Sequence, residues 1–294
     1  MRVGSYLGIP FRVNPLFFVL LLGAAAAGLL PQVLLIFAIV LWHETAHLLA
    51  AKLHRLDVTE VELLPFGGVA RFEALLQTDP GLEWKVAVVG PLSNLLLMGL
   101  LFASRHYYAI PQNLYDFAML ANGGMFLFNL LPALPLDGGR ILRSILVHRR
   151  GFREATELSA LVAQILAAVM CCWGLYTLYL GYTGGAGFCV LGVFVFSSAL
   201  GERKNAVYIF MRYMAHKRSE IRLRRVLPVH QLVATAETSI GEVVKRFQPP
   251  AYHIIWVMDL EGELVGIVGE LELINALFAE GTHIKVGTLV RNKL

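Results

Sequence analysis

Residues 32–52 read QVLLIFAIVLWHETAHLLAAK, an apolar run that contains two histidines and a glutamate near its end. A membrane-spanning helix needs roughly 20 mostly apolar residues, and this run has that length. Ionisable side chains at membrane depth are unfavourable and persist mainly where they face a cavity or bind a metal ion. The stretch therefore predicts a transmembrane helix that carries a functional site.

The composition extends this conclusion to most of the chain. Of the 294 residues, 57% are hydrophobic and 16% are charged, whereas soluble domains contain about 25% charged residues. A disulfide framework is also excluded, because the three cysteines lie inside apolar segments without CxxC spacing. The sequence is that of a membrane protein with a soluble C-terminal part.

We expect a polytopic α-helical membrane protein with six transmembrane helices in residues 1–202. Arginine and lysine gather in the connections on one side of these spans, which predicts that both termini are cytosolic. The first span also resembles a secretion signal, and its removal would leave the later topology unchanged. The expected spans are residues 12–30, 32–52, 84–104, 114–147 (interrupted), 158–180 and 186–202.

His43, Glu44 and His47 form the pattern HExxH within the second span. On a helix, two histidines four residues apart project from one face, so both imidazoles can bind one Zn²⁺ ion. Glu44 is then placed to take a proton from an attacking water molecule. Chance occurrence is the alternative, and the position of the pattern at membrane depth favours the metal site.

A catalytic zinc site needs a third protein ligand, for which Asp137 is the best candidate. At 1.5 Å per residue, the two histidines lie roughly 16–22 Å along the second span from Gln32. Leu131 lies roughly 22 Å along the fourth span from Asp116, so the depths match. Pro132 and Pro135 interrupt the fourth span at this depth. Irregular backbone inside a membrane is tolerated only where it is buried in protein or lines a wet cavity. An interfacial cap is the alternative role for Asp137.

These motifs resemble the site-2 protease family of intramembrane zinc metalloproteases. The resemblance is carried by HETAH at 43–47, Asn-Leu-Leu-Pro at 129–132 and Leu-Asp-Gly-Gly at 136–139. It implies one zinc ion held by His43, His47 and Asp137, with Glu44 as the catalytic base. The implied enzyme is a zinc metalloendopeptidase that cuts within or beside the membrane.

Two further features of the family pattern have ordinary structural explanations as well. Asn129 is thought to stabilise the tetrahedral intermediate, a role that an amide donor can fill, but it could equally cap carbonyls freed by Pro132. The family's usual Asn-Pro-Leu-Pro lacks its first proline here. Gly-Pro-Leu-Ser-Asn at 90–94 resembles a second family motif, which a kinked helix with a hydrogen-bonded asparagine explains nearly as well.

A small β-hairpin is expected on the cytosolic side between the second and third spans. Residues 58–62 and 69–72 flank Pro-Phe-Gly-Gly at 65–68, a typical hairpin pattern. An ordinary membrane-surface loop is the simpler explanation from the residues alone. The family resemblance instead implies an edge strand that receives an extended substrate by β-addition, with Phe66 at the tip as a substrate contact.

Residues 226–294 have a soluble α/β pattern that resembles a single cystathionine-β-synthase (CBS) domain. A capping box at Ser239 and Glu242 predicts a helix through residue 247, followed by strands at 253–259 and 264–269 and a helix at 271–280. The resemblance implies that ATP or another adenine nucleotide acts as a regulator that is not consumed, with Glu272 at the ribose. It also implies pairing of these units in a homo-oligomer.

The basic block at residues 203–225 is interleaved with aromatic residues, a composition that suits either nucleic-acid binding or attraction to anionic lipid. The block directly follows a span and has no nucleic-acid-binding fold around it. We therefore interpret it as a basic juxtamembrane linker and expect no direct nucleic-acid binding.

Chain size and the CBS-like tail narrow the resemblance to a subgroup that processes a membrane-associated pro-protein. In spore formers this substrate is a pro-sigma factor, the membrane surrounds the developing forespore, and inhibitory membrane partners hold the enzyme inactive. A metal-ion transporter and a nucleotide-sensing scaffold are the competing functions. Glu44 argues against both, because transport needs metal ligands but no general base.

Overall fold

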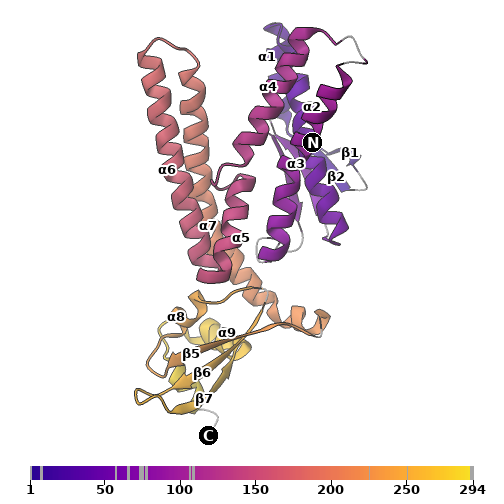
Figure 1. The fold of residues 1–294 in the computed structure, drawn as a ribbon. Coiled ribbons are helices and arrows are strands. Elements are labelled where there is room, and N and C mark those ends of the chain that lie inside the picture. The colour runs from indigo at the N-terminus through magenta and orange to yellow at the C-terminus, as the bar shows by residue number, and fades with distance from the viewer. Residues whose placement is uncertain are drawn as a thin grey trace. The chain divides into compact units, whose positions relative to one another are not determined.

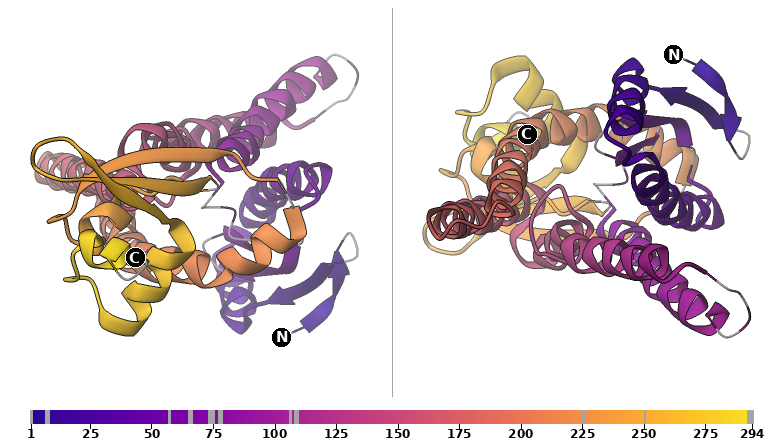
Figure 2. Two further views of the ribbon diagram at one scale, coloured as in Figure 1. Left: turned by 90° about the horizontal axis from the view of Figure 1, so that it is seen from below. Right: turned by 90° about the horizontal axis from the view of Figure 1, so that it is seen from above.

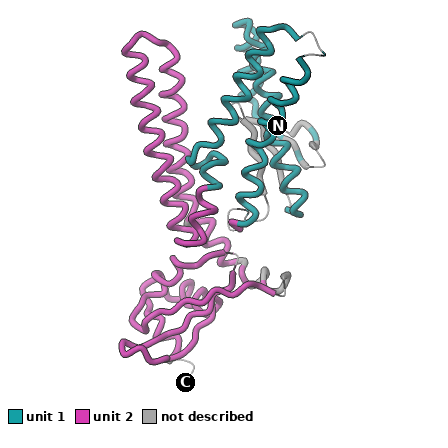
Figure 3. Tube along the Cα trace, in the orientation of Figure 1, with its two compact units in different colours: residues 1–76, 81–141 teal, residues 77–80, 142–294 magenta. Residues whose placement is uncertain are grey.

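The computed structural model of the protein describes residues 2–6, 9–56, 58–64, 67–72, 76, 79–105, 107, 110–224, 226–249 and 251–291. The chain divides into two compact units, which are described in turn (Figure 3). The first unit comprises residues 1–76 and 81–141, and the second comprises residues 77–80 and 142–294.

The first unit combines apolar helices with a small sheet. The helices are α1 (Pro15–Ala26), α2 (Leu30–Leu53), α3 (Pro80–Ser104) and α4 (Gln112–Asn129). The strands are β1 (Arg2–Tyr6), β2 (Ile9–Val13), β3 (Val58–Leu64) and β4 (Gly67–Phe72). They lie side by side in chain order, so β4 is an edge strand of the sheet as described.

The pairing of β3 with β4 is antiparallel, which confirms the predicted hairpin. The other half of the sheet was not predicted: β1 pairs antiparallel with β2, and β2 pairs in parallel with β3. From the sequence, residues 2–13 are interpreted only as a basic segment that precedes an apolar run. Pairing between segments far apart in the sequence depends on tertiary contacts, which a local pattern does not reveal.

The helical conformation is interrupted between α4 and α5 (Asp137–Arg150), where the two predicted proline breaks lie. Ala133 and Leu134 in this interruption are buried, with 1% and 0% of their surface exposed. The irregular backbone is therefore enclosed by protein, as a membrane environment requires.

Two long helices dominate the second unit, α6 (Phe152–Tyr179) and α7 (Gly185–Arg224), and they pack side by side (Figure 1). Small residues allow their backbones to approach closely. A Cβ atom at Gly174 would lie 2.6 Å from the carbonyl oxygen of Gly185, and one at Gly192 would lie 2.8 Å from that of Ala167. Close approach through small residues is typical of helix pairs in membranes.

Among the residues that the structure describes, four helical segments are long and apolar enough to cross a membrane: Leu30–Leu53, Pro80–Ser104, Phe152–Tyr179 and Gly185–Ala215. They correspond to four of the six expected spans. Helix α1 is apolar, but its 12 residues extend only about 18 Å. Helix α4 has 18 residues and includes the buried Asn122. The six-span topology stays a prediction.

The C-terminal tail, residues 226–294, follows α7 and has the predicted order of elements. These are β5 (Val229–Thr235), α8 (Ile240–Lys245), β6 (Tyr252–Met258), β7 (Leu264–Gly269) and α9 (Glu270–Glu280), with an additional α10 (Val286–Arg291). The capping box of Ser239 and Glu242 starts α8 as expected. Strand β6 pairs in parallel with β5 and antiparallel with β7. The tail helices lie against this sheet, where Ile255, Val257 and Val268 are buried (Figure 2).

Residues 203–224, expected as a linker, continue α7 without a break. Ala206, Phe210, Tyr213, Met214 and Lys217 are all buried. Their spacing of three and four residues defines one helical face, which packs within the second unit.

A buried ionic network joins α7 to the tail. The fully buried Lys217 donates from Nζ to the hydroxyl of Tyr213 and, over 3.0 Å, to the carbonyl oxygen of Ala251. Its Nζ also lies 3.9 Å from Oε1 of Glu270. The other oxygen of Glu270 accepts from the main-chain N–H of His253 over 2.7 Å. The tail is therefore attached to the long helix by enclosed polar groups.

Candidate metal centre

His43 and His47 project from one face of α2, one helical turn apart. Their ring centroids lie 4.7 Å apart, with the ring planes at 83°. Both residues are buried, with 2% and 6% of their surface exposed. The uninterrupted apolar sequence of α2 keeps the helix regular through this turn, so the i, i+4 spacing converts directly into a pair of converging imidazoles.

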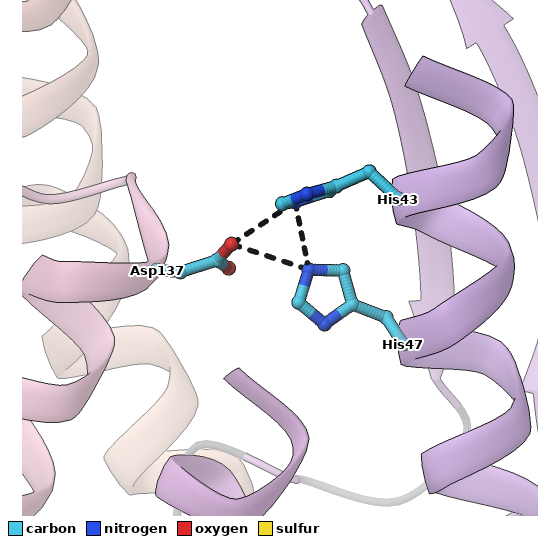
Figure 4. A group of neighbouring side chains, drawn as sticks. All are labelled: His43, His47 and Asp137. Atoms are coloured by element: carbon cyan, nitrogen blue, oxygen red, sulfur yellow. Dashed lines mark hydrogen bonds and ion pairs between the residues drawn. The ribbon is translucent and has the colours of Figure 1, made fainter. Parts of the chain in front are cut away.

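Asp137 is brought to these two histidines at the start of α5 (Figure 4). Its Oδ2 atom lies 3.1 Å from Nε2 of His43 and 3.2 Å from Nε2 of His47. The two Nε2 atoms are 3.1 Å from each other. The structure thus brings together the three residues that the sequence predicts as metal ligands.

Gly138 and Gly139 allow Asp137 to reach this position. A Cβ atom at Gly138 would lie 2.3 Å from the carbonyl oxygen of Leu130, and one at Gly139 would lie 2.4 Å from the carbonyl carbon of Ala133. A larger residue at either position would collide with the preceding loop. The two glycines therefore let that loop fold closely onto the first turn of α5.

The three ligand atoms fit a zinc ion. Two imidazole nitrogens and one carboxylate oxygen form a ligand set that catalytic zinc sites use, with the fourth position left for water or substrate. Tetrahedral zinc with bonds of 2.0–2.1 Å separates its ligand atoms by about 3.3 Å. The observed separations of 3.1 to 3.2 Å agree with this value.

Helix α3 contacts the Nδ1 atoms of both histidines, the ring nitrogens that face away from Asp137. Nδ1 of His47 donates to the carbonyl oxygen of Val86 over 2.8 Å, and Nδ1 of His43 contacts Oδ1 of Asn94. Gly90 lies between these contacts, and a Cβ atom there would be only 2.3 Å from Nε2 of His47. Gly90 and Asn94 belong to the 90–94 motif, so the sequence contained the signal for them although their roles were not identified.

Glu44 follows His43 on α2 and is partly buried. It interacts electrostatically with His47, His43 and Asp137, so its carboxylate belongs to the same local group of charges. A carboxylate beside the ligands, rather than among them, can accept a proton from water without leaving the metal. Its role as catalytic base stays a prediction.

The remaining predicted site residues lie elsewhere. Asn129 is the last residue of α4 and donates from Nδ2 to the carbonyl oxygen of Met125 over 3.1 Å, a contact within its own helix. Glu272 accepts from the N–H of Gly269 over 3.2 Å and thereby caps the start of α9. Phe66 lies outside the described residues. The oxyanion, ribose and substrate roles of these residues stay predictions.

Comparison with known proteins points to membrane zinc metalloproteases. Peptidase family M50 matches residues 31–110 and 105–173. Stage IV sporulation protein FB of Bacillus subtilis is 26% identical over 92% of this chain and 92% of its own length. A zinc metalloprotease of Methanocaldococcus jannaschii is 26% identical over 92% of this chain and 78% of its own length. The solved site-2 protease from the same archaeon superposes with a TM-score of 0.53 at 27% identity, covering 69% of this chain and 94% of that one.

Four helices apolar enough to cross a membrane, together with two histidines that converge on an aspartate and an adjacent glutamate, define a membrane zinc metalloprotease. Within that class, the chain is most similar to site-2 proteases of Peptidase family M50, whose model matches the part of the chain that holds this site.

Proposed function

We propose that this protease cleaves a membrane-associated pro-protein near the cytosolic face of the membrane, and that the substrate is a pro-sigma factor processed during sporulation. One observation supports the hydrolytic chemistry above all. His43, His47 and Asp137 are buried, and the carboxylate oxygen of Asp137 lies within 3.2 Å of a ring nitrogen of each histidine, beside Glu44. The similarity to a sporulation protein over 92% of both chains supports the choice of substrate.

His43, His47 and Asp137 would hold the zinc ion. When bound, the metal supplies Lewis-acid polarisation of the scissile carbonyl and of the hydrolytic water. Glu44 accepts a proton from that water and returns it to the leaving amine. Asn129 donates to the developing oxyanion if its amide turns from Met125 towards the substrate.

Strand β4 is a suitable docking edge for the substrate. It pairs with β3 on one side in the described sheet, and it contacts α2, the helix that carries the histidines. A peptide must be extended to present one bond to the metal, and main-chain pairing with an edge strand holds it extended. We propose that Phe66, which directly precedes β4 in the sequence, contacts the substrate there.

We further propose six membrane spans with both termini in the cytosol, in the membrane that surrounds the forespore. Helices α1 and α4 supply the two spans beyond the four clearly apolar ones. The excess of lysine and arginine in the connections expected on the cytosolic side supports this orientation. Inhibitory membrane partners are proposed from the family resemblance.

The test of the proposed function is Glu44→Gln in the full chain, co-expressed with a candidate pro-sigma factor from the same organism. We expect cleavage to fall by a factor of about 10² to 10⁴, because the base is lost, while zinc content stays at the wild-type level. Glu157→Gln on α6, whose carboxylate is exposed and paired with Arg153, is the matched control and should cleave normally.

N-terminal sequencing of the product identifies the bond that is cut. Retained cleavage in the Glu44→Gln variant would contradict the proposed mechanism. Metal flux without proteolysis in the wild type would instead assign the chain to transport.

For the tail, we propose a CBS-like unit that pairs with its copy in a second chain and binds an adenine nucleotide such as ATP as a regulator. Support comes from the order of its elements, β5-α8-β6-β7-α9. Glu272 lies in the first turn of α9, where a ribose contact is expected, and its carboxylate already accepts from the main-chain N–H of Gly269. We therefore expect weak binding, at millimolar concentrations.

Nucleotide binding to the full chain, measured beside the cleavage rate, tests this role of the tail. ATP at several millimolar should bind and change the rate, and Glu272→Ala should weaken both effects. An absence of binding at that concentration would leave the tail with an assembly or docking role only.

A further inference from the structure

Asn94 on α3 and Asn122 on α4 are fully buried polar residues behind the metal centre, each with 0% of its surface exposed. Oδ1 of Asn94 contacts Nδ1 of His43, and Nδ2 of Asn94 contacts Oδ1 of Asn122. Nδ2 of Asn122 in turn donates to the main-chain oxygen of Asn94 over 2.8 Å. The three side chains form a continuous series of hydrogen bonds across three helices.

One main-chain atom determines which atoms donate and which accept along this series of hydrogen bonds. The carbonyl oxygen of Asn94 can only accept, so the atom of Asn122 that faces it is the amide nitrogen. The amide oxygen of Asn122 therefore accepts from Nδ2 of Asn94, which leaves Oδ1 of Asn94 facing His43. Because this oxygen also only accepts, Nδ1 of His43 carries the hydrogen and Nε2 keeps its lone pair for the metal.

We propose that Asn94 and Asn122 are positioning residues for the metal ligand His43. Asn94 holds the imidazole in the tautomer and orientation that bind zinc, and Asn122 holds the amide of Asn94 in the required direction. The inference deepens the proposed protease function and rests on it for the activity readout. Its principal readout, zinc affinity, needs no substrate.

A neutral amide suits this position better than a charged group. Histidines that bind metals commonly donate their second nitrogen to a carboxylate or a carbonyl. A carboxylate here would add a negative charge at membrane depth, close to Asp137 and Glu44, where each unpaired charge is unfavourable. His47 obtains the same support from the main chain at Val86. Only the support of His43 can therefore be removed by changing side chains.

The experiment measures the zinc Kd of the purified full chain in detergent, by competition with a chromophoric chelator. Asn94→Leu removes the acceptor of His43, and we expect the Kd to rise roughly 10- to 100-fold. Asn122→Leu should have a smaller effect. The double variant should bind no more weakly than Asn94→Leu alone, because Asn122 acts through Asn94. Cleavage should fall in parallel with zinc affinity.

Two further variants separate positioning from a general structural effect. Asn94→Asp keeps an acceptor for His43 but loses the donor to Asn122 and adds a charge, so it should recover only part of the affinity that Asn94→Leu loses. Asn113→Leu on α4, at an exposed asparagine, is the matched control and should bind zinc normally. Absorption bands of the cobalt-loaded protein report ligand geometry, and they should change in folded Asn94→Leu but not in the control.

Two results would overturn the proposal: a zinc Kd within twofold of the wild type in Asn94→Leu, or additive losses in the double variant. If leucine prevents folding, as judged by thermal unfolding, Asn94→Ser replaces it, since serine is too short to reach His43. Weakened zinc binding in the variant together with no proteolysis by the wild type would count against the protease function and still support the positioning role.

Discussion

At Gly90, helix α3 comes so close to the two histidines that the absence of a side chain is a condition of the site. A Cβ atom at this position would lie 2.3 Å from Nε2 of His47 and 2.7 Å from Cε1 of His43. Such distances are far inside van der Waals contact, so either the rings or the helix must move. The motif at residues 90–94 thus has a geometric explanation as well as a family resemblance.

We expect Gly90→Ala to displace the imidazoles and to lower both zinc content and cleavage by at least tenfold. Changes to residues that hold metal ligands in position commonly have effects of this size. Gly99→Ala is the matched control, because Gly99 lies on the same helix and a Cβ atom there meets nothing within 4 Å. Metal analysis of both purified variants tests the expectation. Normal zinc content in Gly90→Ala would show that the helices adjust to the added methyl group.

The grouping of His43, His47 and Asp137 could be predicted because their chemistry is unusual for their place in the sequence. His43 and His47 lie in an apolar run, and Asp137 follows the two prolines that break the fourth span. Each is therefore an ionisable residue in a mostly apolar part of the sequence. Asn122 gave no such signal, because a lone asparagine in an apolar helix has several ordinary explanations. Its partner, Asn94, is 28 residues away, and only the packing of α3 against α4 reveals the connection.

Among the elements, α7 and the tail depend on each other through Lys217. Lys217→Met would remove the ammonium group 3.9 Å from the buried carboxylate of Glu270 and leave that carboxylate to the ring and main-chain N–H groups of His253. Breaking a buried ion pair in this way typically destabilises by about 3–5 kcal/mol. We expect limited proteolysis of residues 226–294 in the full chain to accelerate strongly. Lys204→Met, at an exposed position on the same helix, should not change the rate.

The double variant Lys217→Met/Glu270→Gln provides the decisive comparison. The glutamine amide oxygen can still accept from His253, and no uncompensated charge remains in the interior. We expect much of the protease resistance to return. Equal sensitivity of the single and double variants would mean that the charge of Lys217 is unimportant and that only its packing matters.

His230 makes the stability of the tail dependent on pH. It lies beside His253 on the neighbouring strand, and burial, followed by the charge of His253, lowers the pKa of His230 below 6.5. The folded state then binds fewer protons than the unfolded state, so stability declines as the pH falls through about 6.5 towards the lowered value. Urea unfolding of the full chain between pH 5 and pH 8 should show this decline, and His230→Gln should reduce it.

Sequence patterns predicted the elements of the tail and the hairpin β3–β4 because these form between neighbours in the chain. They missed two features for different reasons. Strands β1 and β2 form through pairing with the distant β3, which local patterns do not reveal. The continuation of α7 could have been predicted, since its buried residues recur at helical spacing. There the basic composition suggested a linker and obscured that periodicity.

At the scale of the whole molecule, the six-span topology can be tested by cysteine accessibility in intact cells or oriented vesicles. Once the three native cysteines are replaced by alanine, Gln112→Cys should react only with an impermeant reagent on the side opposite the cytosol. Glu261→Cys, in the turn between β6 and β7, should react only from the cytosol. Labelling of Gln112→Cys from the cytosol would show that the orientation or the number of spans is wrong.

The unbroken course of α7 makes bilayer thickness relevant to the tail. With 40 residues, the helix is about 60 Å long, whereas the hydrocarbon core of a membrane is about 30 Å thick. A helix that adjusts to a thinner or thicker bilayer does so mainly by tilting, and α7 has no hinge that could absorb the tilt before it reaches Lys217. We therefore expect the height of the tail above the lipid headgroups to change with acyl-chain length, a change that energy transfer from a label at Glu261 to labelled lipid would detect.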